Sequence, residues 1–254
     1  MKKTFYLFTI IFAAMSYTSC ANASKKEAAP EQTAEQAPAA AQDEWITLFD
    51  GTGFDGWRGY GRTDMPKAWT IEDGALKING SGQGEAGAKD GGDIIFDRKF
   101  KNFELTFEWK VSKGGNSGIF YLAQEVQGDP IWKSSPEYQI LDNVNHVDAK
   151  LGKSGNRQSA SLYDLIPAVP QNSKPYGEWN TGSIIVFKGT VLHTQNGENV
   201  VEYHLWTDDW KKMIEGSKFK GWENFINAGG ENREGFIGLQ DHGVHTRDDR
   251  VVED

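Results

Sequence analysis

The stretch FELTFEWKV, residues 103–111, has a hydrophobic residue at every second position and a polar or charged residue between them. A period of two gives a β-strand one face toward a core and one face toward solvent. Other short segments rich in β-branched and aromatic residues are AWTIEDGALKI, GIFYLA, EYQILD, SIIVFKGTVLHTQNGENVVEYHLW and GFIGLQ. Turn-forming pairs such as Asp73-Gly74 and Asn196-Gly197 divide them. The pattern predicts an all-β domain built from many short antiparallel strands.

Only one segment favours a helix. In DDWKKMIEG, residues 208–216, Trp210, Met213 and Ile214 recur at helical spacing. Many short strands, glycine-rich turns and one short helix predict a two-sheet antiparallel sandwich or jelly roll. Residues 45–254 are long enough for a single domain of this kind.

The beginning of the chain has the features of an export signal. Lys2 and Lys3 precede an apolar run that ends in small residues just before Cys20, the single cysteine of the chain. The run is too short, and too closely followed by polar sequence, for a stable membrane span. A lone cysteine directly after such a run resembles a lipoprotein lipobox. Residues 1–19 are therefore predicted to be a signal peptide and Cys20 to be lipidated; ordinary cleavage that leaves a free thiol is the alternative.

Residues 20–44 contain no aromatic residue and are rich in Ala, Glu, Gln and Pro, which predicts a flexible tether. Together with a lipid on Cys20, this predicts a protein anchored in the cell envelope, at the outer membrane on its periplasmic or outer side. The membrane is then contacted only through the lipid. Removing residues 1–19 takes away two lysines and no acid, so the net charge of -9 becomes -11. An anionic protein of this kind is not expected to bind nucleic acid.

Polar side chains stand out on the strand-like segment PEYQILDN, residues 136–143. Alternation puts Glu137 and Gln139 on one face of the strand and Asp142 on the other. A β-bulge after Ile140 would bring Asp142 back beside them. Two carboxylates on one concave face suit glycosidic chemistry, because one group transfers a proton and the other stabilises positive charge or attacks. The alternative is a solvated Glu137 paired with a nearby Lys or Arg.

Further polar candidates lie on other strand-like segments. Asn116 lies among glycines, where a ligand can approach closely, although a plain hairpin turn explains this equally. His193 is the best candidate for acid–base work near pH 7, with a structural histidine as the alternative. Gln240 and His242 share one strand face, with Asp241 on the other. The nine Trp and eight Tyr residues can provide platforms for sugar rings.

Two cofactor classes receive little support. The GxGxxG match at residues 82–87 has no helix behind it, so it predicts a flexible loop instead of a dinucleotide site. His242 and His245 are three residues apart without a helix to align them, which is a weak zinc pattern. The sequence requires no cofactor and assigns no metal ligand, and a divalent cation near His193 or His242 stays an open alternative.

Several motifs occur together in one order: FELTFEWK, GGNSGIFY, PEYQILDN, SLYDLIP, GEWN, HTQNG, SKF and GFIGLQDHG. In this the chain resembles the 3-keto-disaccharide hydrolase domain family over nearly all of residues 45–243. The resemblance implies a concanavalin A-like lectin/glucanase fold with a concave sugar site, and a hydrolase that cleaves glycosides. It also implies a partner oxidoreductase that makes a ketone at C3 of the sugar substrate. A base then removes the acidified C2 proton as the C1 substituent leaves, and water adds to the unsaturated sugar.

The resemblance implies roles for the candidate residues. Glu137 or His193 is the base, and Asp142 orients or assists it. The groups that hold hydroxyls or polarise the ketone are Asn116, Gln139, Gln240 and His242. The chain departs from the family pattern at residues 193–197, which read HTQNG in place of HWLNG, and after GFIGLQDHG, where an Arg-Asn-Ile motif is missing. The second departure predicts a frayed or missing last strand.

Two other functions fit the same fold. A conventional retaining glucanase would need two carboxylates about 5 Å apart, and the spacing Glu137-x-Gln139-x-x-Asp142 is similar to that of glucanase strands. A non-catalytic glycan-binding lipoprotein module is the second alternative, because one sandwich fold carries both lectins and enzymes.

Overall fold

The computed structural model describes residues 45–78 and 87–242, together with the backbone of residues 244–253. The predicted signal peptide, Cys20, the predicted tether and most of the loop 82–87 lie outside the described residues. In the described part of the chain, no helix is long and apolar enough to cross a membrane.

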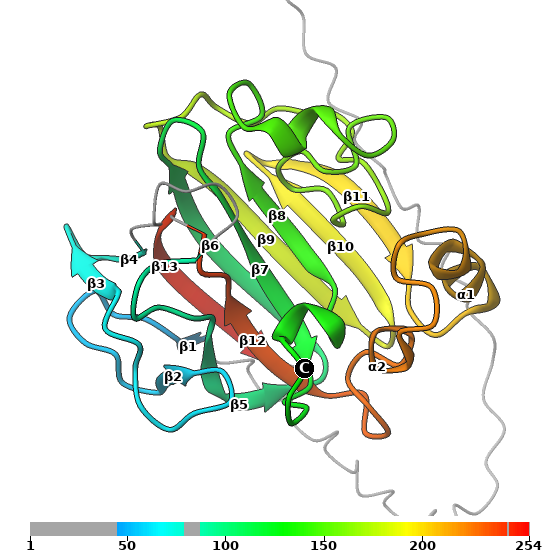
Figure 1. The fold of residues 1–254 in the computed structure, drawn as a ribbon, viewed down its shortest axis with the longest axis horizontal. Coiled ribbons are helices and arrows are strands. Elements are labelled where there is room, and N and C mark those ends of the chain that lie inside the picture. The colour runs from blue at the N-terminus through cyan, green and yellow to red at the C-terminus, as the bar shows by residue number, and fades with distance from the viewer. Residues whose placement is uncertain (1–44, 79–86, 243, 254) are drawn as a thin grey trace, which may run out of the picture. The chain divides into compact units, whose positions relative to one another are not determined.

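Two antiparallel sheets form the domain, which confirms the predicted two-sheet sandwich (Figure 1). The eight-stranded sheet has the order β11-β10-β9-β6-β13-β4-β3, and β1 pairs with β13. Its strands are β1 (Ile46–Thr47), β3 (Trp69–Glu72), β4 (Ala75–Ile78), β6 (Phe103–Val111), β9 (Asn180–Phe187), β10 (Thr190–Gln195), β11 (Glu198–His204) and β13 (Val244–Glu253). The five-stranded sheet has the order β2-β5-β12-β7-β8. Its strands are β2 (Trp57–Gly59), β5 (Ile94–Phe100), β7 (Asn116–Ala123), β8 (Glu137–Leu141) and β12 (Gly235–Leu239).

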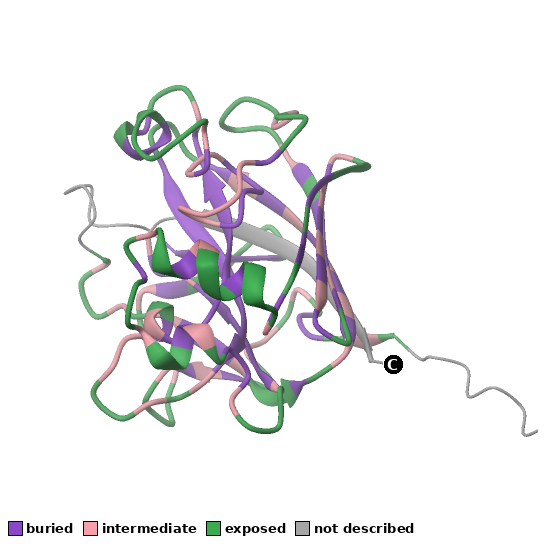
Figure 2. Ribbon diagram, turned by 90° about the vertical axis from the view of Figure 1, so that its right-hand side faces the viewer, coloured by how far each residue is buried: buried purple, intermediate pink, exposed green. Residues whose placement is uncertain are grey.

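The alternation that predicted β6 is present in the fold. Its hydrophobic residues are buried and the residues between them are half-buried. Buried side chains from both sheets meet in one core, where the Phe107 and Tyr138 rings pack edge to face with centroids 5.0 Å apart. Figure 2 shows burial concentrated along the strands and exposure along the loops and the outer sides of the helices. The core between the sheets therefore fixes which face of each strand is turned away from it.

The expectation of a frayed or missing last strand is wrong. β13 lies between β6 and β4. It pairs with β6 from Val244 beside Val111 to Glu253 beside Phe103, and with β4 at His245 and Thr246. A strand between two partners forms backbone hydrogen bonds on both sides. These bonds do not depend on side chains, so β13 forms without the Arg-Asn-Ile motif.

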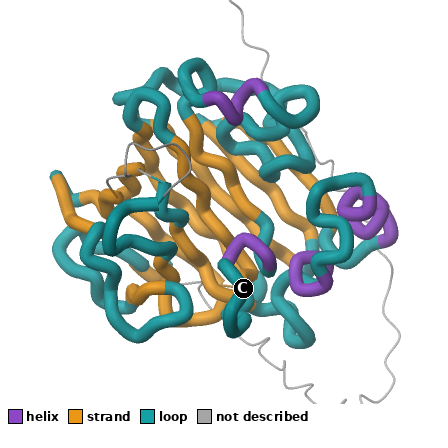
Figure 3. Tube along the Cα trace, viewed as in Figure 1, coloured by secondary structure: helices purple, strands orange, loops and turns teal. Residues whose placement is uncertain are grey.

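The helices are short and lie in the connections (Figure 3). The predicted helix is α1 (Asp208–Glu215), where the Thr207 side chain caps the first turn by accepting from the backbone of Trp210. The structure adds α2 (Glu223–Ile226) and the 3₁₀ turns η1 (Ile131–Lys133) and η2 (Val147–Lys150).

An aromatic stack holds the connection between α1 and α2 against the sheets. Ring centroids are separated by 5.5 Å from Tyr203 to Trp210, by 5.7 Å from Trp210 to Phe225 and by 4.3 Å from Phe225 to Phe219. These rings are buried in the core cluster. The stack therefore holds in place the connection that carries Lys218, Phe219 and Trp222, which line one cavity together with residues of β8.

Candidate functional site

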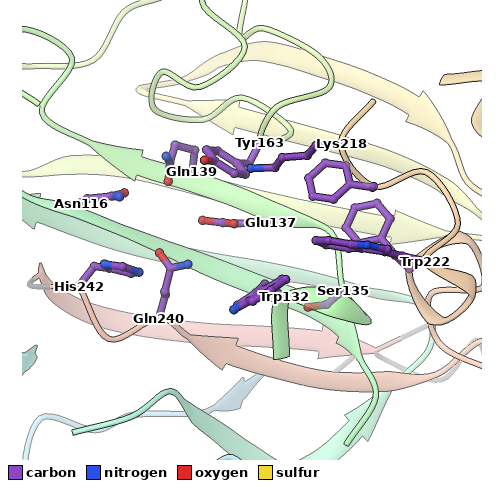
Figure 4. Close-up of a pocket in the computed structure, with 12 residues that line it drawn as sticks. Asn116, Trp132, Ser135, Glu137, Gln139, Tyr163, Lys218, Trp222, Gln240 and His242 are labelled. Carbon is purple, nitrogen blue, oxygen red and sulfur yellow. The ribbon is translucent and has the colours of Figure 1, made fainter. Parts of the chain in front are cut away.

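A cavity of about 440 Å³ lies on the face of the five-stranded sheet that points away from the other sheet. Tyr138 and Ile140 of β8 are part of the core between the sheets, so their neighbours Glu137 and Gln139 point to the opposite side. The volume lies within the range of small-molecule sites. The cavity is lined by aromatic residues (Trp132, Tyr163, Phe219, Trp222, Phe225) and polar residues (Asn116, Ser135, Glu137, Gln139, Lys218, Gln240, His242) (Figure 4).

The structure brings most of the predicted polar residues together here. Glu137 and Gln139 come from β8, Asn116 from β7, and Gln240 and His242 from the turn after β12. These three strands are neighbours in the order β12-β7-β8, so their side chains form the floor of the cavity. In Figure 4 the Glu137 carboxylate lies between Asn116, Gln139 and Gln240.

Glu137 is only 8% exposed, and a glycine makes room for it. A Cβ atom added to Gly118 would lie 2.2 Å from Glu137 Oε1 and 2.7 Å from its Cγ and Cδ. Gly118 is on β7, directly beside β8. Because Gly118 has no side chain, the Glu137 carboxylate can lie against β7.

Gly118→Ala should displace the Glu137 carboxylate and lower kcat/KM by about 10²-fold, because shifts near 1 Å in a reacting group have effects of this size. The thermal midpoint should change little, since the end of a glutamate side chain can move. Rates and melting curves of the variant are compared with those of Gly53→Ala, where an added Cβ meets nothing within 4 Å. Equal rates for the two variants would contradict a catalytic position for Glu137.

The amide side chains offer hydrogen bonds to a ligand. Asn116 is 8% exposed, and its Oδ1 has no hydrogen-bond partner among the described residues. A buried acceptor of this kind is costly unless a ligand or water donates to it. The Gln240 side chain starts from a backbone that two hydrogen bonds to β7 hold in place. The Gln240 carbonyl accepts from Ser117 Oγ at 2.8 Å, and the Gln240 N–H donates to the Gly118 carbonyl at 3.0 Å.

A pair of carboxylates shapes the turn that carries Gln240 and His242. Asp241 points away from the cavity and accepts hydrogen bonds from Ala88 N at 3.1 Å and Gly92 N at 2.7 Å. Its own N–H donates to Asp93 Oδ1 at 2.9 Å. Burial, with the nearby charge of Asp241, raises the pKa of Asp93 to about 6. This network anchors the turn to residues 87–93.

The sequence reasoning missed several of the lining residues, among them Tyr163 and Lys218, although the motifs SLYDLIP and SKF contain these two. The Tyr163 hydroxyl donates to Asp148 Oδ2 at 2.9 Å. Burial raises the pKa of Tyr163, and the charges of Glu137 and Asp148 add to this. The Lys218 amine lies 4.2 Å from the centre of the Tyr163 ring.

One arginine holds this side of the cavity in place. Arg157 donates through its terminal nitrogen to Asp148 Oδ1 at 2.6 Å and through Nε to Asp164. Lys218 Nζ lies 3.9 Å from Asp164 Oδ2. Partial burial lowers the pKa of Lys218, although Asp164 opposes the shift.

Asp142 does not reach the cavity, and the bulge that would have brought it there is absent. β7 and β8 pair without a register shift from Asn116 beside Leu141 to Phe120 beside Glu137. Asp142 follows the end of β8 and accepts from Gly114 N at 2.8 Å, Val144 N at 3.1 Å and Asn145 Nδ2 at 2.7 Å. Burial alone would raise the pKa of Asp142, but these hydrogen bonds outweigh burial and lower it. In this structure Asp142 stabilises a turn.

His193 also lies outside the cavity, in the core on the other side of β8. It is fully buried and packs against the Tyr138 ring with centroids 4.9 Å apart. Its Nδ1 is 2.9 Å from the Ala160 carbonyl, which can only accept, so Nδ1 carries the proton. Nε2, 2.8 Å from the Tyr121 hydroxyl, therefore accepts from it. Burial lowers the pKa of His193 to about 4, so the ring is neutral near pH 7.

This neutral histidine should make stability depend on pH. Because the pKa falls from 6.5 to about 4 on folding, the unfolded chain binds the proton more readily. The neutral His193 ring therefore contributes about 3 kcal/mol to the free energy of unfolding. This contribution is complete above pH 6.5 and is lost as the pH falls toward 4. Urea unfolding at several pH values should show this slope in the wild type and a shallower slope in His193→Gln. Equal slopes would contradict a buried neutral His193.

The described residues contain no group of three or more His, Cys, Asp or Glu side chains that could hold a metal ion. The side chain of His245, the other half of the weak zinc pattern, is not among those described.

Comparison with known proteins gives consistent matches. Residues 44–251 match the 3-keto-alpha-glucoside-1,2-lyase-like domain family. A 3-keto-disaccharide hydrolase of Bacteroides thetaiotaomicron is 54% identical over 276 residues, which cover 96% of this chain and 95% of that protein. A crystal structure of a candidate glycosyl hydrolase from Parabacteroides distasonis has a TM-score of 0.70 at 26% identity, over 82% of this chain and 93% of that one. A second such structure from the same organism has a TM-score of 0.62 at 24% identity, over 82% and 98% of the two chains, and supports the fold alone.

Proposed function

Because the chain belongs to the 3-keto-alpha-glucoside-1,2-lyase-like family, we propose that it cleaves the glycosidic bond of 3-keto glycosides by elimination followed by hydration. As an enzyme it is a glycoside-cleaving hydrolase, similar over nearly its whole length to a 3-keto-disaccharide hydrolase. The finer proposal concerns the substrate and the order of the chemical steps.

The proposal rests on one observation: Glu137 is the only carboxylate among the described residues that line the cavity. Conventional glycoside hydrolases of the common type use two, about 5 Å apart when they retain configuration and roughly 6.5–9.5 Å apart when they invert it. A single base is enough if the substrate carries a ketone at C3, because the ketone acidifies the C2 proton. The absence of a second carboxylate from the described lining therefore favours elimination over the conventional glucanase reaction.

In the proposed first step, the Glu137 carboxylate removes the C2 proton. The bond between C1 and the leaving oxygen breaks as a double bond forms between C1 and C2. Water then adds to that double bond, with its oxygen at C1 and a proton at C2, so the net reaction is hydrolysis. The side chains of Asn116, Gln139, Gln240 and His242 surround Glu137; they bind sugar hydroxyls and donate hydrogen bonds to the negative charge that forms on the ketone oxygen.

Aromatic side chains suit the apolar faces of a sugar ring. The Trp132 and Trp222 rings are 5.2 Å apart between centroids, with a tilt of 44°, and both line the cavity. Trp132 is 39% exposed, so a ligand can cover it. We assign these two rings to substrate binding, because an aromatic face combines a large apolar area with a fixed shape.

Incubation of the purified protein with a 3-keto disaccharide and with its unoxidised parent tests this function. We expect release of monosaccharide from the oxidised substrate only, and deuterium at C2 of the product when the reaction runs in D₂O. Cleavage of the unoxidised parent would favour a conventional glucanase. Binding without turnover of either sugar, unchanged in Glu137→Gln, would favour a glycan-binding module.

The place in the cell is a separate proposal. The sequence before residue 45 predicts a lipid anchor at Cys20, which would hold the protein in the cell envelope. An oxidoreductase that oxidises C3 of a sugar would have to supply the 3-keto substrate there. Labelling of cells with a radioactive fatty acid should mark the wild type and leave Cys20→Ser unlabelled. Equal labelling of the two would contradict the anchor.

A further inference from the structure

A second hollow borders the cavity, and Lys218 lies between the two. The second hollow has a volume of about 540 Å³, and its polar lining includes Lys153, Asn156 and Asp164. Lys218 is part of the lining of both spaces. An occupant that extends from Glu137 into the second hollow would therefore pass the Lys218 amine.

We propose that Lys218 is the general acid that protonates the leaving glycosidic oxygen, with the keto sugar above Glu137 and the leaving group in the second hollow. This assignment rests on the elimination proposed above. A glycosidic oxygen joins the two parts of a disaccharide, so it lies at the boundary between two subsites, which is the place of Lys218.

The contacts of Lys218 leave its proton donors available to a ligand. Its amine makes no hydrogen bond to any described residue; it lies against the faces of the Tyr163 and Phe219 rings and 3.9 Å from Asp164 Oδ2. Asp164 already pairs with Arg157. A lysine whose nearest carboxylate is engaged with another cation can turn its N–H groups toward a substrate oxygen.

Burial, more than the surrounding charges, makes the Lys218 ammonium group a better proton donor. The titratable and charged groups that act on it are Arg157, Tyr163, Asp164, Glu137 and Asp148. Burial is the largest influence and lowers its pKa; Arg157 acts in the same direction, while the three carboxylates act against it. A lowered pKa makes an ammonium group a better proton donor, because proton transfer is most effective when the donor pKa approaches the working pH.

The proton balance closes over one cycle. In the elimination, Glu137 takes the C2 proton and the Lys218 ammonium gives a proton to the departing oxygen. In the hydration, water adds its hydroxyl to C1, Glu137 delivers a proton to C2 after its own has exchanged with solvent, and the Lys218 amine takes the remaining proton of that water. Both groups end in the protonation state in which they began, and no oxidant or reductant is needed.

Two 3-keto glycosides that differ in their leaving group test the assignment. A sugar alkoxide needs a proton to leave, whereas 4-nitrophenolate does not. Lys218→Met should therefore lower kcat/KM by about 10²–10³-fold with the 3-keto disaccharide and by less than about tenfold with the 4-nitrophenyl substrate. The alkaline limb of the wild-type pH profile should disappear. Lys220→Met, a change to an exposed lysine in the same segment, should leave both rates unchanged.

Other outcomes would overturn the assignment. An equal loss with both leaving groups would show that Lys218 has only a structural or binding role. Lys218→Arg keeps the positive charge but is a very poor proton donor; recovery of disaccharide cleavage in this variant would show that charge alone is needed. If the wild type cleaves neither substrate, the proposed elimination itself is wrong. This outcome is distinct from a failure of the Lys218 assignment, because it is seen in the wild type alone.

The place of the leaving group has its own test. Lys153 is an exposed residue that lines the second hollow, and its side chain makes no hydrogen bond to any described residue. Lys153→Trp should fill part of this hollow and raise KM for a 3-keto disaccharide by about 5- to 10-fold. KM for a 3-keto methyl glycoside, whose leaving group is small, should stay as in the wild type. An equal effect on both substrates would contradict the assignment of the second hollow.

Discussion

Glu137→Gln is expected to lower kcat on a 3-keto disaccharide by about 10³-fold or more, near the upper range for loss of a general base. The amide has almost the same shape as the carboxylate but cannot take the C2 proton. The side chain is 8% exposed and lies beside Gly118, so the replacement fits the same space. Initial rates and the dissociation constant of the unoxidised disaccharide separate the chemical step from binding.

Glu202→Gln is the matched control, because Glu202 is an exposed residue on β11, outside the cavity lining. It should leave kcat unchanged. In Glu137→Gln, exchange of the C2 proton of a bound keto sugar with D₂O should stop together with product release. Exchange that continues at the wild-type rate would show that another group removes the proton.

The fold was predictable because one rule repeats along the chain. Alternation in β6 and paired turn residues indicate many antiparallel strands, and a two-sheet sandwich buries one face of each. The same rule placed Glu137 and Gln139 on one face of β8, where the structure has them. Local sequence was sufficient in these cases because a strand fixes the side on which each residue lies.

The position of His193 could not be predicted from alternation alone. Alternation along β10 puts His193 on the same face as Val191, which is fully buried. Which face is inward depends on how β10 packs against the other sheet, and that information is not local. The structure does contain a register shift beside His193, between His193 and Thr194 in the pairing with β11.

The bulge expected after Ile140 is not formed, so Asp142 stays in its turn.

Tyr163 and Lys218 could not be placed from the sequence because loops carry them. Their positions depend on Arg157, which joins Asp148 to Asp164, and on the stacked rings of Phe219 and Phe225. These contacts join residues that are six to nine positions apart. No spacing rule specifies such contacts, whereas a period of two specifies a strand face.

Arg157→Met is expected to destabilise the fold by about 3–5 kcal/mol, because it leaves buried Asp148 without a cation and buried Asp164 with only the distant Lys218 amine. The side chains of Asp148 and Asp164 are only 4% and 9% exposed. For a domain of this size, such a loss lowers the thermal midpoint by roughly 10 °C. Differential scanning calorimetry measures it. Arg62→Met is the matched control: Arg62 and Asp64 form a pair whose side chains are 44% and 67% exposed, and such pairs contribute about 0–1 kcal/mol.

A triple variant separates the uncompensated charge from lost packing. If the buried charges cause the loss, adding Asp148→Asn and Asp164→Asn to Arg157→Met should restore most of the stability, because neutral amides do not need a cation. If packing of the long Arg157 side chain causes it, the triple variant should be no more stable than Arg157→Met. The amide oxygen introduced by Asp148→Asn can still accept from the Tyr163 hydroxyl, so restored stability should bring back the position of Tyr163. The ion network would then act on the cavity by holding one of its walls, separately from the proton transfer assigned to Glu137.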